Sequence, residues 1–255
     1  MKVVILAGGY GTRLSELTQV IPKPMVVIKN KPILWHIMNF YAYFGHKEFI
    51  IALGYKAESI KEYFLNFKLM NNNFSIDFKN DKVQLLSEDS LDWKVNLIDT
   101  GLDTLTGGRI KSIQKYTNGE SFLLTYGDGL CNVNINSLIE FHKNHGKIAT
   151  MTAVRPQARF GELTLKDNKI TSFKEKPQLN EGWINGGYFV LDQRVFDYIG
   201  KKDNMFEREP LMNLSNSNEL MAYKHDGFWQ CMDTKKDYDR LQNLANNNPP
   251  WELNN

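Results

Sequence analysis

The amino-acid sequence predicts an α/β fold built on a doubly wound, mostly parallel β-sheet. Short apolar runs bounded by glycines or polar turns are typical of buried strands. Helical patterns alternate with these runs, as expected when each parallel strand is followed by a crossover helix. We expect strands over 2–7, 48–54, 121–129 and 149–154, and helices over 31–45, 57–67 and 134–146.

Local signals support these elements in turn. The first run, "KVVILA", is short and rich in β-branched residues and ends at glycines. Pro32 suits the first turn of the helix over 31–45, and Gly45 suits its end. The pattern over 57–67 is amphipathic, and Gly146 is a suitable cap for the helix that precedes it.

The remaining segments predict additions to this sheet. Short strand-like runs separated by polar turns indicate an excursion from the main sheet over about 68–98. After residue 160 the pattern predicts a hairpin turning at 167–168, and therefore a more β-rich half. We expect one domain over 1–233, with 234–255 as its C-terminal helix and tail.

Composition excludes several classes of protein. The 255 residues suffice for a well-buried core, and the net charge of +2, with no long basic run, gives no nucleic-acid footprint. Two cysteines without a CxxC pair imply neither a disulfide framework nor a zinc site. No apolar stretch is long enough to span a membrane and none resembles a signal peptide, so we expect a cytoplasmic protein.

A glycine-rich turn follows the first predicted strand. Gly8, Gly9 and Gly11 stand where backbone N–H groups can approach phosphate oxygens, at the carboxyl end of a strand. The turn lacks the Lys-Ser/Thr ending of a Walker loop and the spacing of a dinucleotide fingerprint. A tight strand-to-helix connection without a ligand is the alternative interpretation.

Two cations follow this turn closely. Arg13 and Lys23 are residue types that bind phosphate groups. Lys23 lies in "PKP", and its flanking prolines favour extended geometry at Pro22 and Lys23. The alternative is a solvated loop lysine, but a rigidly presented cation beside a glycine turn favours a triphosphate site.

Two aspartates follow apolar runs and are candidate metal ligands. Asp128 lies in the turn "YGDG", and Asp233 ends the run "FWQCMD". Mg²⁺ prefers one or two carboxylates together with substrate phosphates, which fits this pair. Each could instead cap a helix, and Asp233 directly precedes a predicted helix that begins at Thr234.

The chain resembles the sugar-1-phosphate nucleotidyltransferase family over nearly its whole length. The motifs are "LAGGYGTRL", "PKPM", "KPILWHI", "YGDG", "EKP", "INGGYFV" and "DT". Further blocks, chiefly "DTGLDTLTGGRIK", "RFGEL" and "GFWQCMDT", resemble its glucose-1-phosphate cytidylyltransferase branch. The resemblance implies a Rossmann-like nucleotidyltransferase fold and a homo-oligomer, for which the aromatic-rich helix around Trp35 to Phe44 offers apolar surface.

The resemblance also implies roles for matching residues. The catalytic residues would be Arg13, Lys23, Asp128 and Lys176, and Asp128 and Asp233 would hold Mg²⁺. The nucleotide would be bound by Leu6, Ala7, Gly8, Gly9, Gly11, Thr12, Arg13, Lys23, Thr104, Thr106, Gly107, Arg109 and Gly127. The acceptor would be bound by Arg159, Gly161, Glu175, Lys176 and Asn185.

The implied reaction transfers CMP from CTP to glucose 1-phosphate and releases pyrophosphate. Arg155 and Glu162 depart from the branch pattern, so a different sugar phosphate or a charged non-sugar phosphate is an alternative acceptor. These two residues could equally form a salt-bridged pair on the hairpin surface. A catalytically inactive nucleotide-sensing subunit is a third hypothesis, against which the retained Arg13, Lys23, Asp128 and Asp233 argue.

Overall fold

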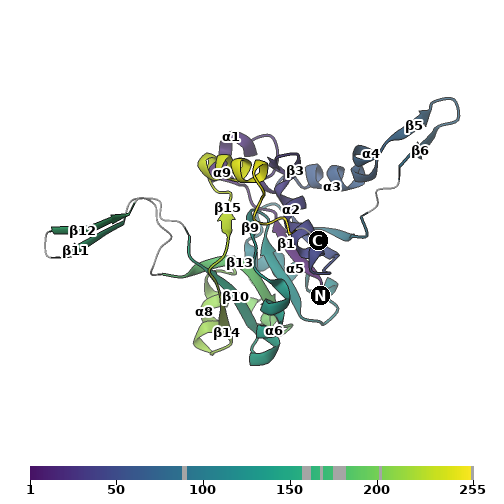
Figure 1. The fold of residues 1–255 in the computed structure, drawn as a ribbon. Coiled ribbons are helices and arrows are strands. Elements are labelled where there is room, and N and C mark those ends of the chain that lie inside the picture. Colours follow the sequence, from purple (N-terminus) through teal and green to yellow (C-terminus); the bar gives the residue numbers. More distant parts are fainter. Residues whose placement is uncertain (88–90, 157–161, 167–168, 175–181, 201–202, 254–255) are drawn as a thin grey trace.

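The fold is organised around a seven-stranded sheet, the main sheet (Figure 1). The structure is a computed structural model that describes residues 1–87, 91–156, 162–166, 169–174, 182–200 and 203–253. In spatial order the strands are β14 (Leu220–His225), β10 (Ala149–Val154), β13 (Ile184–Leu191), β8 (Phe122–Tyr126), β1 (Val3–Ala7), β4 (Glu48–Leu53) and β7 (Lys94–Asp99). Only β13 runs antiparallel to its neighbours in this sheet, which confirms the predicted mostly parallel arrangement.

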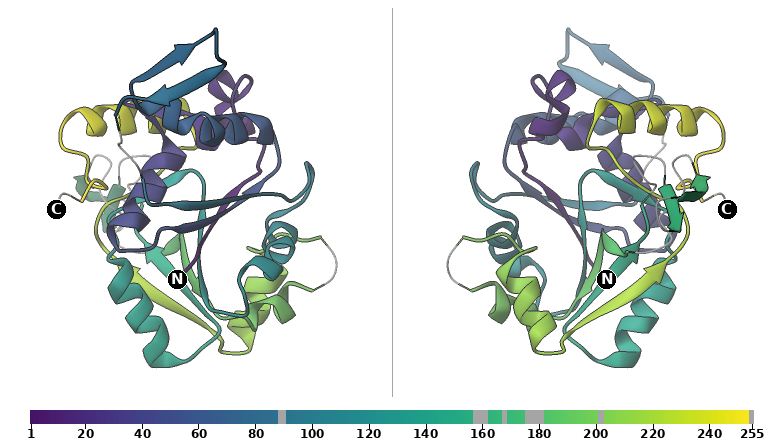
Figure 2. Two further views of the ribbon diagram at one scale, coloured as in Figure 1. Left: turned by 90° about the vertical axis from the view of Figure 1, so that its right-hand side faces the viewer. Right: turned by 90° about the vertical axis from the view of Figure 1, so that its left-hand side faces the viewer.

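Helices cover both faces of the main sheet, as a doubly wound fold requires (Figure 2). The longer helices are α2 (Ile33–Tyr43), α3 (Ala57–Leu65), α6 (Ile135–His145), α8 (Glu209–Asn216) and α9 (Lys235–Asn246). The shorter ones are η1 (Thr12–Leu14), α1 (Ser15–Thr18), η2 (Lys23–Met25), α4 (Phe67–Asn71), α5 (Thr106–Ser112), η3 (Gln114–Tyr116) and α7 (Val195–Ile199). Among the described residues, no helix is both long enough and apolar enough to cross a membrane.

Alternation along the strands divides the core into two clusters. Val3 and Ile5 of β1 face one cluster, which contains residues of α2, α3, α6 and α9. Val4 and Leu6 face the other, which contains residues of α5, α7 and α8. Because both faces of β1 are covered, this strand is apolar throughout, as its sequence predicted.

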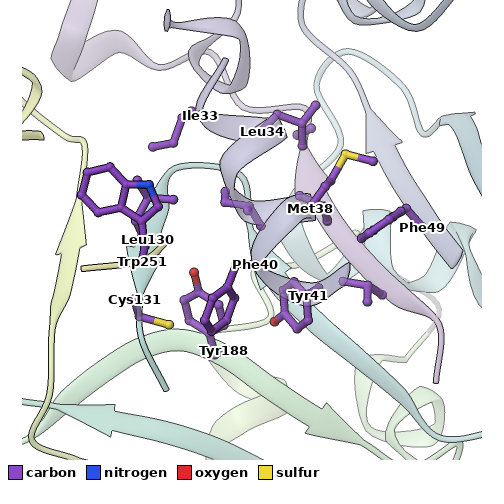
Figure 3. Packing of buried hydrophobic residues seen from close by; sticks show 14 of the residues in the cluster. Ile33, Leu34, Met38, Phe40, Tyr41, Phe49, Leu130, Cys131, Tyr188 and Trp251 are labelled. Atoms are coloured by element: carbon purple, nitrogen blue, oxygen red, sulfur yellow. The ribbon is translucent and has the colours of Figure 1, made fainter. Parts of the chain in front are cut away.

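Helix α2 lies in the middle of the first cluster (Figure 3). Its Tyr41 stacks on Tyr188 of β13, with ring centroids 5.9 Å apart. Trp251 of the C-terminal tail is also buried, and its indole N–H donates to Nδ1 of His36 at 3.3 Å. Most apolar side chains of α2 are therefore used in the core, so the helix does not offer the apolar surface that was expected of it.

In the described part of the chain, four two-stranded pairs complete the β-structure. They are β2 (Val27–Ile28) with β3 (Lys31–Pro32), β5 (Phe74–Asp77) with β6 (Lys82–Leu85), β9 (Gly129–Cys131) with β15 (Trp229–Cys231), and β11 (Glu162–Lys166) with β12 (Lys169–Lys174). The pairing of β11 with β12 confirms the hairpin predicted after residue 160, whose turn at 167–168 lies outside the described residues.

The predicted excursion over 68–98 is only partly correct. The hairpin β5–β6 does leave the main sheet and projects from the body of the molecule (Figure 1). Strand β7, however, pairs in parallel with β4 over six residues and forms an edge of the main sheet. Its partly exposed pattern is typical of an edge strand and resembles that of the exposed hairpin before it.

Candidate active site

A cavity of about 600 Å³ opens at the carboxyl ends of the parallel strands. The end of β1 contributes Ala7 to its wall, the turn after β8 contributes Asp128, and the loop after β7 contributes Thr104. Ligands of open α/β sheets bind at this edge. Because β13 runs in the opposite direction, its beginning lies here, which brings Asn185 to the same wall.

Most of the residues singled out from the sequence line this cavity. They are Leu6, Ala7, Gly8, Gly9, Gly11, Thr12, Arg13, Lys23, Thr104, Thr106, Arg109, Gly127, Asp128, Asn185 and Asp233. Gly107 is instead buried, and in the described part of the chain it is not among the lining residues. Arg159, Gly161, Glu175 and Lys176 lie outside the described residues.

Four of the lining residues form a chain of ion pairs, in the order Arg13, Asp233, Lys23 and Asp128. The Lys23 ammonium donates to Asp128 Oδ2 at 2.7 Å and to Asp233 Oδ1 at 2.6 Å. Arg13 Nη1 lies 2.9 Å from Asp233 Oδ2. The Lys23 side chain is 10% exposed, whereas that of Arg13 is 71% exposed. The fold thus joins residues separated by up to 220 positions into one group of two cations and two carboxylates.

Pairing of β9 with β15 brings the two aspartates together. Gly129 is paired with Cys231, and the amide of Met232 donates to the carbonyl of Asp128 at 2.8 Å. Asp233 does not cap the helix that follows it, because Thr234 is the N-cap of α9 and forms a capping box with Asp237. The capping alternative is therefore wrong for Asp233, whose carboxylate faces Lys23 and Arg13 instead.

Burial and neighbouring charges shift the pKa values of Lys23 and Asp233 in opposite directions. Burial is the largest influence on the pKa of Lys23 and lowers it, but Asp128 and Asp233 together raise that pKa above its ordinary value. Burial raises the pKa of Asp233, and Lys23 and Arg13 outweigh this effect, so that the carboxyl has a lowered pKa. Both groups are therefore charged at neutral pH.

The donor set of the cavity fits a hard divalent cation. Asp128 and Asp233 each bring a carboxylate oxygen within 2.7 Å of the same lysine nitrogen, so the two oxygens are close neighbours. Two carboxylates plus substrate phosphates are the ligands that Mg²⁺ prefers. Burial raises the pKa of Cys231, on the same wall, to about 12, so a soft thiolate ligand does not compete at neutral pH.

The backbone of "PKP" differs slightly from the sequence expectation. Pro22 has extended geometry, with φ of −68° and ψ of 150°. Lys23, in contrast, opens the single 3-10 turn η2 and is not extended, although Pro24 follows it. The turn is buried, so the lysine is rigidly presented as expected and is not a solvated loop residue.

Gly11 and Gly9 of the loop differ in why the position holds a glycine. Gly11 has φ of +65°, and a Cβ there would lie 3.1 Å from Thr18 Cγ2. Gly9 has no neighbouring heavy atom within 4 Å of such a Cβ. The first position needs glycine for the fold, whereas the second leaves open space on the cavity wall.

This contrast gives a prediction. Gly9→Ala is expected to keep the melting temperature but to raise the KM for nucleotide about tenfold, because a methyl group would keep phosphates from the loop amides. Gly11→Ala is expected to cost about 1–2 kcal/mol of unfolding free energy, the penalty of a left-handed backbone at a non-glycine residue. Thermal unfolding and steady-state kinetics separate the two. An unchanged nucleotide KM in Gly9→Ala would contradict close approach at this position.

The buried side chain of Arg109 connects several loops through hydrogen bonds to their carbonyl groups. Its guanidinium donates to the carbonyls of Gly8 and Leu53, at 3.0 and 2.9 Å. It also donates to the carbonyls of Gly101 and Leu102, at 2.7 and 3.0 Å. A Cβ on Gly8 would lie 2.3 Å from this guanidinium, so Gly8 makes room for the arginine. Burial lowers the pKa of Arg109.

Arg109 and Arg13 should therefore respond oppositely to the same substitution. Arg109→Met is expected to lower the free energy of unfolding by about 3 kcal/mol, because it leaves buried carbonyls without a donor. Arg13→Met should change stability little, since its side chain is mostly exposed, but should lower turnover. Urea unfolding of both variants measures the difference. Equal stabilities would show that Arg109 does not hold the loops.

The sequence analysis did not predict four polar residues of the wall, Tyr10, Asp103, Tyr126 and Glu207. Tyr126 donates to Glu207 at 2.7 Å, and both line the cavity. Tyr10, inside the glycine loop, donates to Asp103 at 2.5 Å and links that loop to the 102–105 segment. Tyr126 stood within the quoted "YGDG", which was a usable signal. Glu207 had none, because its neighbours in the sequence are unremarkable.

Comparison with known proteins places this fold and cavity in a class. The chain belongs to the nucleotidyl transferase family, whose match extends over residues 2–241. The protein is accordingly a nucleotidyltransferase enzyme.

Individual relatives show which members of the family this chain is similar to. The chain is 49% identical over 252 residues to the probable glucose-1-phosphate cytidylyltransferase of Bacillus subtilis (strain 168), covering 98% of this chain and 96% of that protein. It is 48% identical over 254 residues to the glucose-1-phosphate cytidylyltransferase of Salmonella typhimurium, covering 99% of each chain. The crystal structure of HddC from Yersinia pseudotuberculosis matches with a TM-score of 0.69 at 26% identity, covering 95% of this chain and 98% of that one.

Proposed function

We propose that this nucleotidyltransferase transfers CMP from CTP to glucose 1-phosphate, giving CDP-glucose and pyrophosphate, with Mg²⁺ as its cofactor. The cluster of Arg13, Lys23, Asp128 and Asp233 beside the glycine loop is the observation that carries the reaction type. The choice of CTP and glucose 1-phosphate rests on the named relatives. The charged side chains of this cluster argue against the third hypothesis, a nucleotide-sensing subunit without activity.

The chemistry is an in-line displacement at phosphorus. A phosphate oxygen of the acceptor forms a bond to the α-phosphorus of the nucleotide, and the bond from that phosphorus to the bridging oxygen of pyrophosphate breaks. Because two anions must meet, positioning and charge neutralisation are the main catalytic tasks. Both thiols are neutral at working pH, since burial raises the pKa of Cys131 and of Cys231 to about 12. Neither thiol is therefore expected to form a covalent intermediate.

The residues of the cavity divide this work. Amides of the glycine loop would receive the phosphates, and Arg13 and Lys23 would neutralise them. Asp128 and Asp233 would hold Mg²⁺, which when bound supplies further positive charge at the phosphate oxygens. Lys23 is well placed to contact the α-phosphate, because it lines the cavity and its backbone is held between two prolines.

Acceptor binding is proposed for residues of the later half. Asn185 lines the cavity, where its amide can contact sugar hydroxyls. Lys176 would bind the acceptor phosphate, and Glu175, Arg159 and Gly161 would contact the rest of the acceptor.

For Arg155, the surface interpretation is favoured over acceptor binding. Its guanidinium carbon lies 4.2 Å from the ring centroid of Trp183, and its Nη1 lies 3.9 Å from Asp226 Oδ1. Among the described residues that line the cavity, Arg155 is not included. Asp226 is thus one ion-pair partner of Arg155, and the side chain of Glu162 lies outside the described residues, so the pair suggested by the sequence stays a prediction.

Pyrophosphate release tests the substrates directly. The enzyme is incubated with Mg²⁺, one nucleoside triphosphate and one phosphorylated acceptor, and CTP with glucose 1-phosphate is expected to give the strongest release. Equal or better turnover with UTP or dTTP would overturn the nucleotide assignment, since a site that hydrogen-bonds the base edge discriminates against the wrong partner. Release only with a charged non-sugar phosphate would overturn the acceptor and keep the cytidylyl transfer.

A homo-oligomer and a cytoplasmic location stay predictions. The hairpin β5–β6 supports self-association, because Phe74 and Ile76 pair with Leu85 and Val83 on one apolar face. Phe74, Ile76 and Val83 are at least 39% exposed, and an isolated two-stranded hairpin is only marginally stable in water. Light scattering after gel filtration measures the oligomeric state.

A further inference from the structure

Glu207 lies between the two sides of the cavity and accepts hydrogen bonds from both. The hydroxyl of Thr106, on the proposed nucleotide side, donates to Glu207 Oε2 at 2.5 Å. The hydroxyl of Tyr126, at the end of β8, donates to Glu207 Oε1 at 2.7 Å. The two oxygens of one carboxylate therefore hold two elements that are not adjacent in the sequence.

On the acceptor side, this carboxylate determines the orientation of Asn185 through Tyr126. The single phenolic hydrogen of Tyr126 is used by Glu207, so its oxygen can only accept. Asn185 Nδ2 donates to that oxygen at 3.2 Å, and Asn185 Oδ1 accepts from the amide of Gly187 at 2.8 Å. Both the nitrogen and the oxygen of the Asn185 side-chain amide therefore have a hydrogen-bond partner. Through Tyr126, Glu207 thus determines how this amide is oriented at the cavity wall.

On the nucleotide side, the segment that carries Glu207 is docked on the first turn of α5. The amide of Gly107 donates to the carbonyl of Asn204 at 2.9 Å, and the amide of Phe206 donates to the hydroxyl of Thr106 at 2.9 Å. A Cβ on Gly107 would lie 2.1 Å from Asn204 Oδ1. Gly107 therefore permits this docking, and the hydroxyl of Thr106 is fixed as both acceptor and donor.

We propose that Glu207 is a positioning residue that sets the placement of the acceptor subsite relative to the nucleotide subsite. It acts through Tyr126 and Asn185 on one side and through Thr106 on the other. The naming of the two subsites rests on the proposed function. The hydrogen-bonded chain itself does not, and it can be tested without substrates.

Two variants break the chain at different links. Tyr126→Phe removes the link to Asn185 and leaves the bond from Thr106 to Glu207, so the KM for acceptor should rise about tenfold while the KM for CTP stays within about twofold. Glu207→Gln can accept from only one of the two hydroxyls through its single carbonyl oxygen. It should raise the acceptor KM and lower kcat, each about tenfold.

Glu209→Gln is the matched control, because Glu209 is exposed at the start of α8, and among the described residues it is not part of the cavity wall. Its KM values and kcat should equal those of the wild type. If Tyr126→Phe lowers only the melting temperature, or raises both KM values equally, Glu207 has a merely structural role and the proposal is overturned.

Crystal structures of the two variants give a readout that needs no substrate. The Asn185 amide is expected to rotate in both variants, and the Thr106 hydroxyl is expected to move in Glu207→Gln. Unchanged positions of Asn185 and Thr106 would overturn the positioning role. If the wild type releases no pyrophosphate with any sugar phosphate while these side chains do move, the proposed function fails and the positioning role stands.

Discussion

Lys23→Met is expected to lower kcat by at least about 100-fold, the scale of losing one preorganised charge contact in a transition state. The ammonium is 10% exposed, and the 3-10 turn η2 between two prolines holds its backbone. Its backbone is therefore fixed before the reaction begins, so only the side chain has to move from the carboxylates to the α-phosphate on which negative charge develops. Steady-state kinetics with CTP and glucose 1-phosphate measure the effect.

Lys23→Arg is the matched control, because it keeps the charge but changes the shape of the donor group. A planar guanidinium is not equivalent to a compact ammonium at a crowded site, so we expect partial activity at most. If Lys23→Met retains kcat and raises only the KM for CTP, Lys23 contributes uniform binding and not transition-state stabilisation.

The same substitution should also change the affinity of the protein for a divalent cation. In the cluster, the Lys23 ammonium lies between the Asp128 and Asp233 carboxylates, at 2.7 and 2.6 Å. A cation must compete with this ammonium unless nucleotide phosphates draw the lysine away. Without nucleotide, Lys23→Met should therefore bind Mn²⁺ at least about tenfold more tightly than the wild type, as read by electron paramagnetic resonance.

Calorimetry of the same protein supplies a second measurement. Loss of the ammonium leaves two neighbouring carboxylates without their cation, so Lys23→Met should melt at a lower temperature in the presence of a chelator. Mn²⁺ should restore that temperature in the variant more than it raises it in the wild type. Equal Mn²⁺ affinity in the two proteins would contradict competition between the lysine and the metal.

Much of the fold and part of the cavity wall were predictable because their signals are local in the sequence. Strand β1, the glycine turn and Lys23 lie within 25 residues, and each is marked by its own residue types. Asp128 was predictable for a related reason: a buried parallel strand delivers the residues after its last position to the carboxyl edge of the sheet.

The features that the sequence could not indicate depend on contacts between distant segments. The Arg109 guanidinium meets the Gly8 carbonyl across 101 positions, and Thr106 meets Glu207 across another 101. Strand β7 was assigned to the excursion because an edge strand is only half covered, so its pattern lacks the continuous apolar run of β1. Neither kind of information is present in a local pattern of residue types.

Asp128→Asn and Asp233→Asn are each expected to abolish measurable turnover while the protein remains folded. An amide keeps an acceptor oxygen for Lys23 but loses the negative charge that a hard divalent cation requires. Each single variant also leaves Lys23 paired with one remaining carboxylate, at 2.6 or 2.7 Å, so its buried charge is not stranded. Circular dichroism and thermal unfolding check the fold, and pyrophosphate release checks activity.

The double variant separates a shared site from two independent ones. If both aspartates hold one ion, removing the second should lower activity little beyond the first, because residues that act as a unit are strongly non-additive. Stability should behave in the opposite way: the double variant leaves the Lys23 ammonium, 10% exposed, without a carboxylate, so its loss should exceed the sum of the single losses. Additive losses of activity would contradict a shared ion. So would a substrate-bound structure with the two carboxylates more than about 7 Å apart, since each Mg²⁺–oxygen bond is about 2.1 Å.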